Sequence, residues 1–356
     1  AFFIIAEFDH PPEEEYVMAA YLVRRFLLAL LTIWVVSIMS FIIIQLPPGD
    51  TADAQIKMLV EIRGIMSPEQ ADALRHSMGL DVPPHKRYVL WVQNLMQGKL
   101  GMSFGMGGTR SVSGSAPVPV EQIIGDRIWM TIALSGFTIL FTWTLAIPIG
   151  IYSAVRQHSV GDYTFTFLGF TGLAVPDFLL GLVLMYLALA YLDQSVGGLF
   201  STEQLVKPWS LAKVWDLITH LWIPAIVLGT SGTASLIRIM RNNLLDELGK
   251  PYVVTAKAKG VSPWRAIIKY PVRIALNPLV STAGYLLPAL VGGSVIVSVV
   301  LGLPTLGPML LQSYLMQDVH SGAFILLMLG TLTVIGTFLS DILLAVVDPR
   351  IKFGTQ

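Results

Sequence analysis

The chain alternates long stretches with few or no charged side chains and shorter polar segments. Six of the apolar stretches are long enough to cross about 30 Å of hydrocarbon as a helix of about 20 residues. They are Phe26–Leu46, Ile128–Val155, Tyr163–Leu192, Leu217–Ile237, a stretch from near Ile274 to near Leu301, and Ser321–Ser340. This pattern predicts an all-α, polytopic membrane protein with six transmembrane helices.

The end of the fifth span is predicted from a local break. No charged residue occurs between Ile274 and Gln317, but this stretch is too long for a single crossing. Gly302, Leu303 and Pro304 favour an interruption of the helix. We therefore expect a span that ends near Leu301, followed by a partly buried segment at the level of the membrane.

The composition agrees with a membrane protein and excludes several other classes. Hydrophobic residues make up 54% of the chain and charged residues 13%, which is too apolar for a water-soluble surface. The formal net charge is +0, so we expect no general attraction to nucleic acid. Cysteine is absent, which excludes disulfides, thiolate metal sites and a cysteine nucleophile.

Basic residues lie beside the spans mainly on one side of the membrane. Arg24 and Arg25 precede the first span, and Arg156 lies between the second and third. The segment between the fourth and fifth spans holds the largest group, which consists of Arg238, Arg241, Lys250, Lys257, Lys259, Arg265, Lys269 and Arg273. Short cytoplasmic loops are enriched in Lys and Arg. Both termini and this basic loop are therefore predicted to be cytoplasmic.

The spans and loops divide the chain into four parts. These are an N-terminal tail (1–20), the first span (21–46), an extracytoplasmic helical domain (47–126) and a core of five spans (127–356) that contains the cytoplasmic loop 241–273. In the extracytoplasmic domain, Ser67 to Gln70 has the sequence of a capping box, and the apolar spacing in His85–Met96 predicts a second, amphipathic helix. The Gly- and Ser-rich residues 101–116 predict a flexible loop.

Sequence motifs for catalysis or nucleotide binding are not found. The chain has no HExxH, no GxSxG and no P-loop, so it is not expected to bind ATP through a P-loop of its own. A membrane enzyme and an ion-coupled secondary carrier remain alternatives. Asp177, which follows Pro176 in the third span, is the main intramembrane charge and either lines a translocation pathway or caps a broken helix.

The basic loop predicts two short helices joined by a glycine turn. Pro251 can begin the first helix, Gly260 can end it in a left-handed conformation, and Ser262-Pro263 can begin the second. The small residues Ala256, Ala258 and Gly260 would let a partner approach the backbone closely, and Lys257 and Lys259 would meet acidic groups. From the residues alone, a docking site and a simple positive-inside anchor are equally good interpretations.

The segment VVTAKAKGVSPWRAIIKYPVRIALNP strongly resembles the coupling loop of bacterial ABC importer permeases of the dipeptide/oligopeptide type. Three further segments resemble the same family in the same order: the first span with its Leu-Pro-Pro-Gly-Asp ending, the extracytoplasmic MSPEQADALRHSMGLDVPPHKRYVLWVQNLMQGKLGMSFG, and the C-terminal DPRIKF. The stricter family motif, Glu-Ala-Ala-x-x-x-Gly, is matched only at Ala256 and Gly260, since Val254 and Thr255 occupy the Glu and first Ala positions.

This resemblance implies a type I ABC importer permease architecture in a bacterial inner (cytoplasmic) membrane. The implied partners are a second homologous permease subunit, two cytoplasmic ATPases that hold ATP and Mg, and an extracytoplasmic substrate-binding protein. No cofactor is expected in this chain. The residues expected to couple to the ATPases are Ala256, Lys257, Ala258 and Gly260. The implied substrates are short peptides, with oligosaccharides, opines and metal chelates as alternatives.

Overall fold

A computed structural model describes residues 13–46, 52–53, 56–57, 60, 67–77, 81–103, 118–192, 197–316 and 318–347. The elements in chain order are α1 (Glu13–Ile44), α3 (Pro68–Ser77), α4 (Pro84–Met96), β1 (Met102–Ser103), β2 (Val118–Pro119), α5 (Val120–Val155), α6 (Val160–Ala174), α7 (Asp177–Leu192), α8 (Thr202–Leu205), α9 (Leu211–Leu248), α10 (Pro251–Ala258), α11 (Pro263–Lys269), α12 (Pro271–Ala275), α13 (Asn277–Val300), α14 (Leu306–Leu315) and α15 (Val319–Val347). The described part of the chain is therefore almost entirely helical, as predicted.

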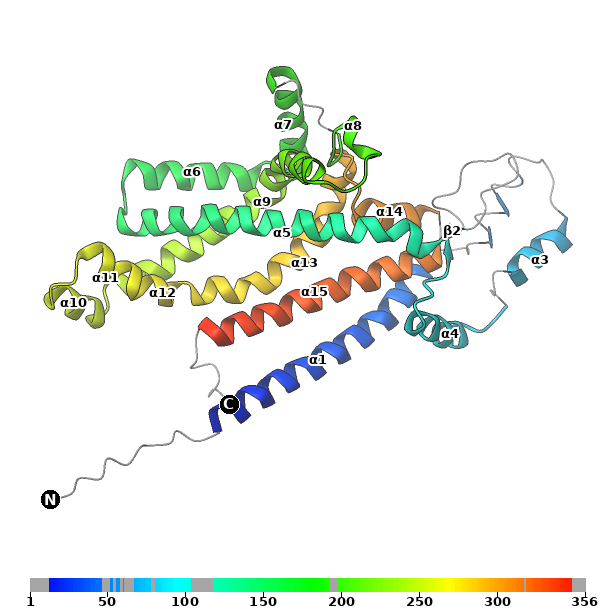
Figure 1. The fold of residues 1–356 in the computed structure, drawn as a ribbon, viewed down its shortest axis with the longest axis horizontal. Coiled ribbons are helices and arrows are strands. Elements are labelled where there is room, and N and C mark those ends of the chain that lie inside the picture. The colour runs from blue at the N-terminus through cyan, green and yellow to red at the C-terminus, as the bar shows by residue number, and fades with distance from the viewer. Residues whose placement is uncertain are drawn as a thin grey trace.

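The long helices form a bundle in which each packs along the next. In Figure 1, α1 lies beside α15, α15 beside α13, and α9 beside α5 and α6. An ion pair of 3.1 Å between Arg25 and Asp341 adds a polar link between α1 and α15. Close approach of α5 and α9 depends on Gly150, because a Cβ atom at this position would lie 2.6 Å from Cβ of Met240.

Four described helices are long and apolar enough to cross a membrane: Leu22–Ile44 in α1, then α5, α9, and Val319–Leu343 in α15. The pair α6 and α7 adds a fifth if it is counted as one broken span. The expected fifth span corresponds to α13, which has 24 residues, ends at Val300 and is followed by α14 after a break at Gly302. The total of six spans stays a prediction.

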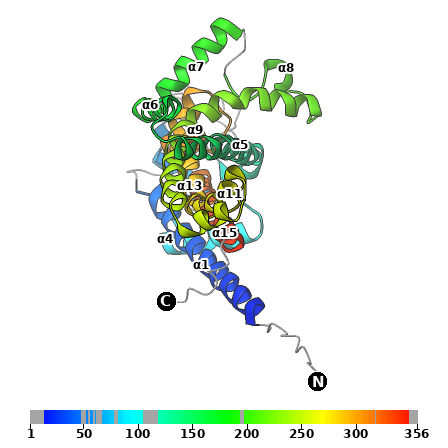
Figure 2. The same ribbon diagram turned by 90° about the vertical axis from the view of Figure 1, so that its left-hand side faces the viewer.

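The third span is not the single crossing that we expected over Tyr163–Leu192. It breaks into α6 and α7, which meet at an angle of 106°, and α7 projects away from the bundle (Figure 2). The break follows from Pro176, since a proline pushes the preceding residue out of the helical region, and Val175 has φ −84° and ψ 127°.

Three helices extend across boundaries expected from the sequence, and the division into four parts stays a prediction. Helix α1 begins at Glu13, within the predicted tail, and α5 begins at Val120, before the predicted domain boundary at residue 126. Helix α9 continues to Leu248, so the first eight residues of the predicted loop 241–273 are helical. In each case the helix extends past its apolar stretch, because charged side chains outside the hydrocarbon do not prevent helix formation.

The described residues of the segment between α1 and α5 are fastened to the bundle by ring packing and by hydrogen bonds. Phe41 of α1 packs on Tyr88 and Trp91 of α4, with ring centroids 5.5 and 5.8 Å apart, and Ser37 Oγ lies 2.7 Å from the Tyr88 hydroxyl. The Ser103 hydroxyl donates to Asp318 Oδ2 at 2.5 Å, which links β1 to the start of α15.

The sequence predictions for this segment are confirmed in part. The capping box is present, with Ser67 N donating to Gln70 Oε1 at 3.2 Å and Gln70 N donating to Ser67 Oγ at 3.3 Å. The predicted helix over His85–Met96 is α4. The flexible loop expected over 101–116 is wrong at its start, where Met102 and Ser103 pair with β2, and residues 104–117 lie outside the described part of the chain.

Candidate functional site: the basic hairpin and an adjacent ion pair

Helices α10 and α11 form a helical hairpin, here called the basic hairpin (residues 250–270), at one end of the bundle (Figure 1). As predicted, Pro251 is the first residue of α10 and Pro263 the first of α11. Gly260 has φ +79° and joins the two helices. This left-handed conformation lets Gly260 N donate to Lys257 O at 3.0 Å and Val261 N donate to Ala256 O at 3.2 Å, which closes α10.

The base of the basic hairpin is packed into the bundle. Ile267 of α11 and Val272 and Ala275 of α12 belong to a buried apolar cluster that also contains Ala146 and Ala154 of α5, Leu236, Met240 and Leu244 of α9, and Leu279 of α13. Because these side chains are buried together, a displacement of the hairpin must displace the ends of α5, α9 and α13 as well.

The four residues expected to couple to a partner do not share one environment. Ala256 is only 8% exposed and lies with buried Val253 on the inner face of α10, whereas Lys257, Ala258 and Gly260 are exposed. The small side chain of Ala256 thus faces the chain itself, because residues three apart on a helix share a face, and the coupling role expected for Ala256 stays a prediction.

The outer face of the basic hairpin combines apolar and basic side chains. Val254, Trp264 and Ile268 are large hydrophobic residues with exposed fractions of 61%, 58% and 48%. They are accompanied by exposed Lys257, Lys259 and Arg265. We call these six residues the hairpin surface. A groove with apolar walls and acidic edges is the complementary partner for such a surface.

Tyr252 connects α10 back to the end of α9. Its hydroxyl donates a short hydrogen bond to Glu247 Oε2. Burial, followed by the hydrogen bond and charge of Glu247, raises the pKa of Tyr252. The phenol therefore keeps its proton, and the hydrogen bond, at every physiological pH.

Pro176 and Asp177, the residues predicted to line a pathway, are distant from the basic hairpin. They lie at the break between α6 and α7, at the end of α6 opposite to the hairpin (Figure 1). Asp177 is the first residue of α7, a position that suits a carboxylate at a helix N-terminus. The structure thus does not bring the two sets of predicted residues together.

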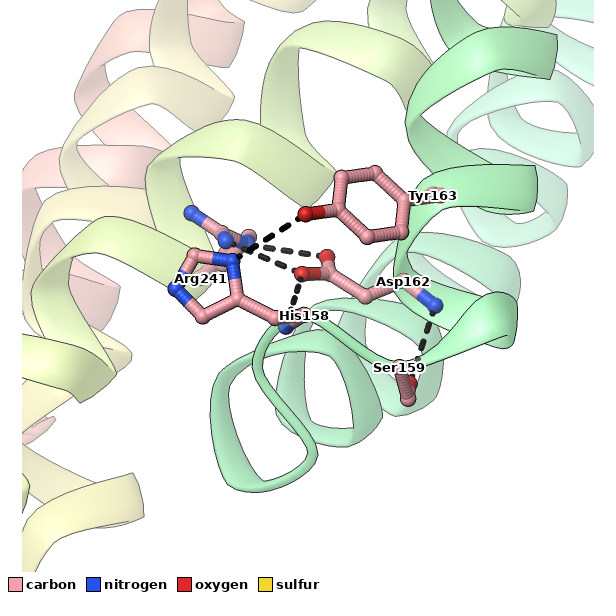
Figure 3. Close-up of polar contacts among 5 residues, drawn as sticks. All are labelled: His158, Ser159, Asp162, Tyr163 and Arg241. Carbon is pink, nitrogen blue, oxygen red and sulfur yellow. Dashed lines mark hydrogen bonds and ion pairs between the residues drawn. The ribbon is translucent and has the colours of Figure 1, made fainter.

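A buried ion pair near the basic hairpin was missed by sequence reasoning. Arg241 of α9 binds Asp162 of α6 through two contacts of 3.0 Å, Nε to Oδ1 and Nη2 to Oδ2 (Figure 3). The side chain of Asp162 is 3% exposed and that of Arg241 is 23% exposed. Such bidentate, charge-assisted pairs are among the stronger polar contacts in proteins.

The residues before Asp162 hold its carboxylate in place. His158 N donates to Asp162 Oδ2 at 3.0 Å, and Asp162 N donates to Ser159 Oγ at 3.2 Å, which caps α6 (Figure 3). His158 has φ +62°, an uncommon conformation for a residue other than glycine. The sequence signal was the Ser-x-x-Asp spacing at the start of an apolar stretch, but nothing in the sequence indicated Arg241 as the partner.

The ion pair lies directly before the basic hairpin in the chain. From Arg241, α9 continues for about two turns to its end at Leu248. Asp162 therefore ties α6 to the part of α9 that leads into the hairpin. Among the described residues, no group of three or more His, Asp or Glu side chains is arranged to hold a metal ion.

Bundled apolar helices with an exposed helical hairpin at one end define a multi-pass membrane protein with a surface suited to a partner. The model of the family described as "Binding-protein-dependent transport system inner membrane component" matches residues 146–353, more than half of the chain. The model of the N-terminal part of such membrane components matches residues 18–135. The chain therefore belongs to the family of inner membrane components of binding-protein-dependent transport systems, the permease subunits of ABC importers.

Named relatives agree with this family. The chain is 33% identical to the oligopeptide transport system permease protein AppB of Bacillus subtilis, over 94% of this chain and 100% of that one. It is 28% identical to the dipeptide transport system permease protein DppB of Escherichia coli K12, over 94% and 99%. A solved structure of the MetNI methionine ABC transporter in an inward facing conformation matches with 19% identity and a TM-score of 0.49, over 64% of this chain and 97% of that chain.

Proposed function

We propose that this permease subunit imports short peptides through a pathway that it forms together with a second, homologous permease. Two cytoplasmic ATPases bind and hydrolyse ATP with Mg, and an extracytoplasmic binding protein delivers the substrate. Support for peptides comes from the names of relatives that align over almost their whole length, AppB and DppB. Oligosaccharides and opines are the alternative substrates.

The observation that carries the proposal is the combination of an exposed hairpin surface and a buried hairpin base. Lys257 of this surface and the adjacent Ala258 and Gly260 are exposed where a partner can reach them, while Ile267 packs in the same cluster as Leu236 and Met240 of α9. A displacement of the hairpin by a partner therefore also displaces the long helices. In this proposal Ala256 positions α10 from inside and does not contact the ATPase.

The proposed orientation places the hairpin and both termini in the cytoplasm of a bacterial cell, with the chain in the inner membrane. The basic residues support this orientation, because the hairpin surface alone carries Lys257, Lys259 and Arg265. The capped helix α3 and helix α4 then lie on the outer side, where we propose that they help to receive the binding protein.

ATPase activity of the co-purified complex in lipid tests the proposal. We expect hydrolysis to rise when the binding protein is added, and to rise further with the peptide that it carries. Stimulation by oligosaccharide-loaded binding protein, without an effect of peptides, would keep the importer but replace the substrate class. Uptake that follows a proton or sodium gradient in the absence of any ATPase would instead show a secondary carrier.

We also expect Asp177 to contribute to the pathway. Replacing Asp177 by Asn removes a charge at the break between α6 and α7 and keeps the shape of the side chain. If the carboxylate faces the pathway, the uptake of cationic peptides falls relative to that of neutral peptides of the same length. Uptake assays with both peptide classes check this. If the variant takes up each class with the same kinetics as the wild type, Asp177 would instead have a helix-capping role.

A further inference from the structure

A cleft between α6 and α9 has features that the transport role does not use. It has a volume of about 420 Å³ and surrounds the Asp162–Arg241 pair. Its apolar wall includes Phe165, Phe170 and Ile237, and its polar rim includes Arg238. Asp162 is the only carboxylate among the described residues that line the cleft, and Arg241 neutralises it.

Arg238 gives this cleft a positive charge that no described residue balances. Its side chain is exposed, and within the described part of the chain no carboxylate lies within 4.0 Å of its nitrogens. The guanidinium lies 5.3 Å from the centre of the Phe170 ring, a cation–π contact that orients the side chain along the cleft. Its N–H groups remain available for an anion.

The position of the cleft along α6 matches the boundary between water and hydrocarbon. Helix α6 begins at Val160, immediately after the short loop that contains Arg156, which we place in the cytoplasm. Further along α6, Tyr163, Phe167 and Phe170 have exposed fractions of 61%, 69% and 56%. Exposed aromatic side chains next to a basic group are typical of the headgroup region, with acyl chains lying along the apolar helix surface.

We propose that this cleft binds the headgroup of an anionic phospholipid. The phosphodiester accepts hydrogen bonds from Arg238, and the Asn242 amide is a further donor on the same cleft, whereas the Tyr163 hydroxyl lies 3.4 Å from His158 Nδ1 and is shared with that ring. The acyl chains lie against Phe167 and Phe170. A bound lipid would fill the space between α6 and α9 beside the Asp162–Arg241 pair. The site depends on the proposed orientation but not on the transported substrate.

Native mass spectrometry of the complete complex tests this site. We would extract the complex with its partner subunits from membranes that contain phosphatidylglycerol and count the lipids that stay bound in detergent. We expect Arg238→Gln to retain phosphatidylglycerol about fivefold more weakly than wild type, which corresponds to the loss of one basic contact. We expect Arg238→Lys to keep most of the binding, and phosphatidylcholine to bind equally weakly in all variants.

A matched control is Arg273→Gln, which removes an exposed charge of α12 outside the cleft and should leave lipid retention unchanged. An equal loss in both Gln variants would show only a general attraction of basic residues to the membrane and would overturn the site. Separation of the permease subunits in Arg238→Gln would also overturn it, because a protein partner would then occupy the cleft. Displacement of the lipid by inorganic phosphate alone would show a free anion site instead.

Discussion

Replacing Gly260 by Val is expected to abolish the stimulation of ATP hydrolysis by the loaded binding protein while the permease remains folded. Gly260 has φ +79°, a conformation that costs a residue with a Cβ atom about 1–2 kcal/mol and is worse for a β-branched one. No atom beyond the chain neighbours lies within 4 Å of a Cβ built at this position. The valine therefore strains the backbone without a clash, and the strain is relieved by turning α10 relative to α11, which misplaces the hairpin surface.

Two further variants make this experiment specific. Gly249→Val places the same side chain just before the hairpin, where φ is −85° and no atom beyond the chain neighbours lies within 4 Å of the added Cβ. This control should keep stimulated hydrolysis. Gly260→Asn should keep part of it, since Asn tolerates the left-handed conformation better than Val. Full stimulation in Gly260→Val would show that the turn does not carry coupling.

The second large effect is expected from Arg241→Gln. This change leaves the carboxylate of Asp162, which is 3% exposed, without its cation, and breaking one side of a buried pair typically costs about 3–5 kcal/mol. Asp162→Asn should be milder, because Arg241 is 23% exposed and can reach water. The midpoint of thermal unfolding of the purified complex measures the loss, and we expect the double variant to be more stable than Arg241→Gln alone.

An exposed ion pair supplies the comparison for this series. Asp81 pairs with His76, and their side chains are 51% and 85% exposed. Asp81→Asn should therefore change stability by less than about 1 kcal/mol. If Arg241→Gln lowered the midpoint of unfolding no more than Asp81→Asn does, the Asp162–Arg241 pair would not stabilise the contact between α6 and α9.

Sequence reasoning succeeded where the signal was local. The capping box at Ser67, the first residues of α10 and α11, and the left-handed Gly260 each depend on side chains within a few positions of one another. Apolar stretches located the long helices, because this signal also lies in neighbouring residues. They did not locate the helix ends, because helices such as α9 continue beyond the apolar stretch into water. The apolar residues Val253 and Ala256 are three positions apart, and this spacing could have shown the inner face of α10.

Features that depend on distant parts of the chain were not predicted. Arg241 and Asp162 are 79 positions apart, so their pairing follows from the packing of α9 on α6 and from no local pattern. Pro176 indicated a kink, but a single proline does not determine an angle of 106° between α6 and α7. That angle is set by what each helix packs against. The same limit applies to the cleft, which exists only because the two helices lie side by side.

The corner between α6 and α7 also restricts what can surround it. A helix end leaves carbonyl oxygens at its last turn and amide hydrogens at the first turn of the next helix without partners inside either helix. In hydrocarbon each such unsatisfied group costs several kcal/mol, and lipid tails offer nothing to bond with. The corner at Val175 and Pro176 must therefore contact water or another polypeptide, so the junction of α6 and α7 itself cannot lie against lipid tails.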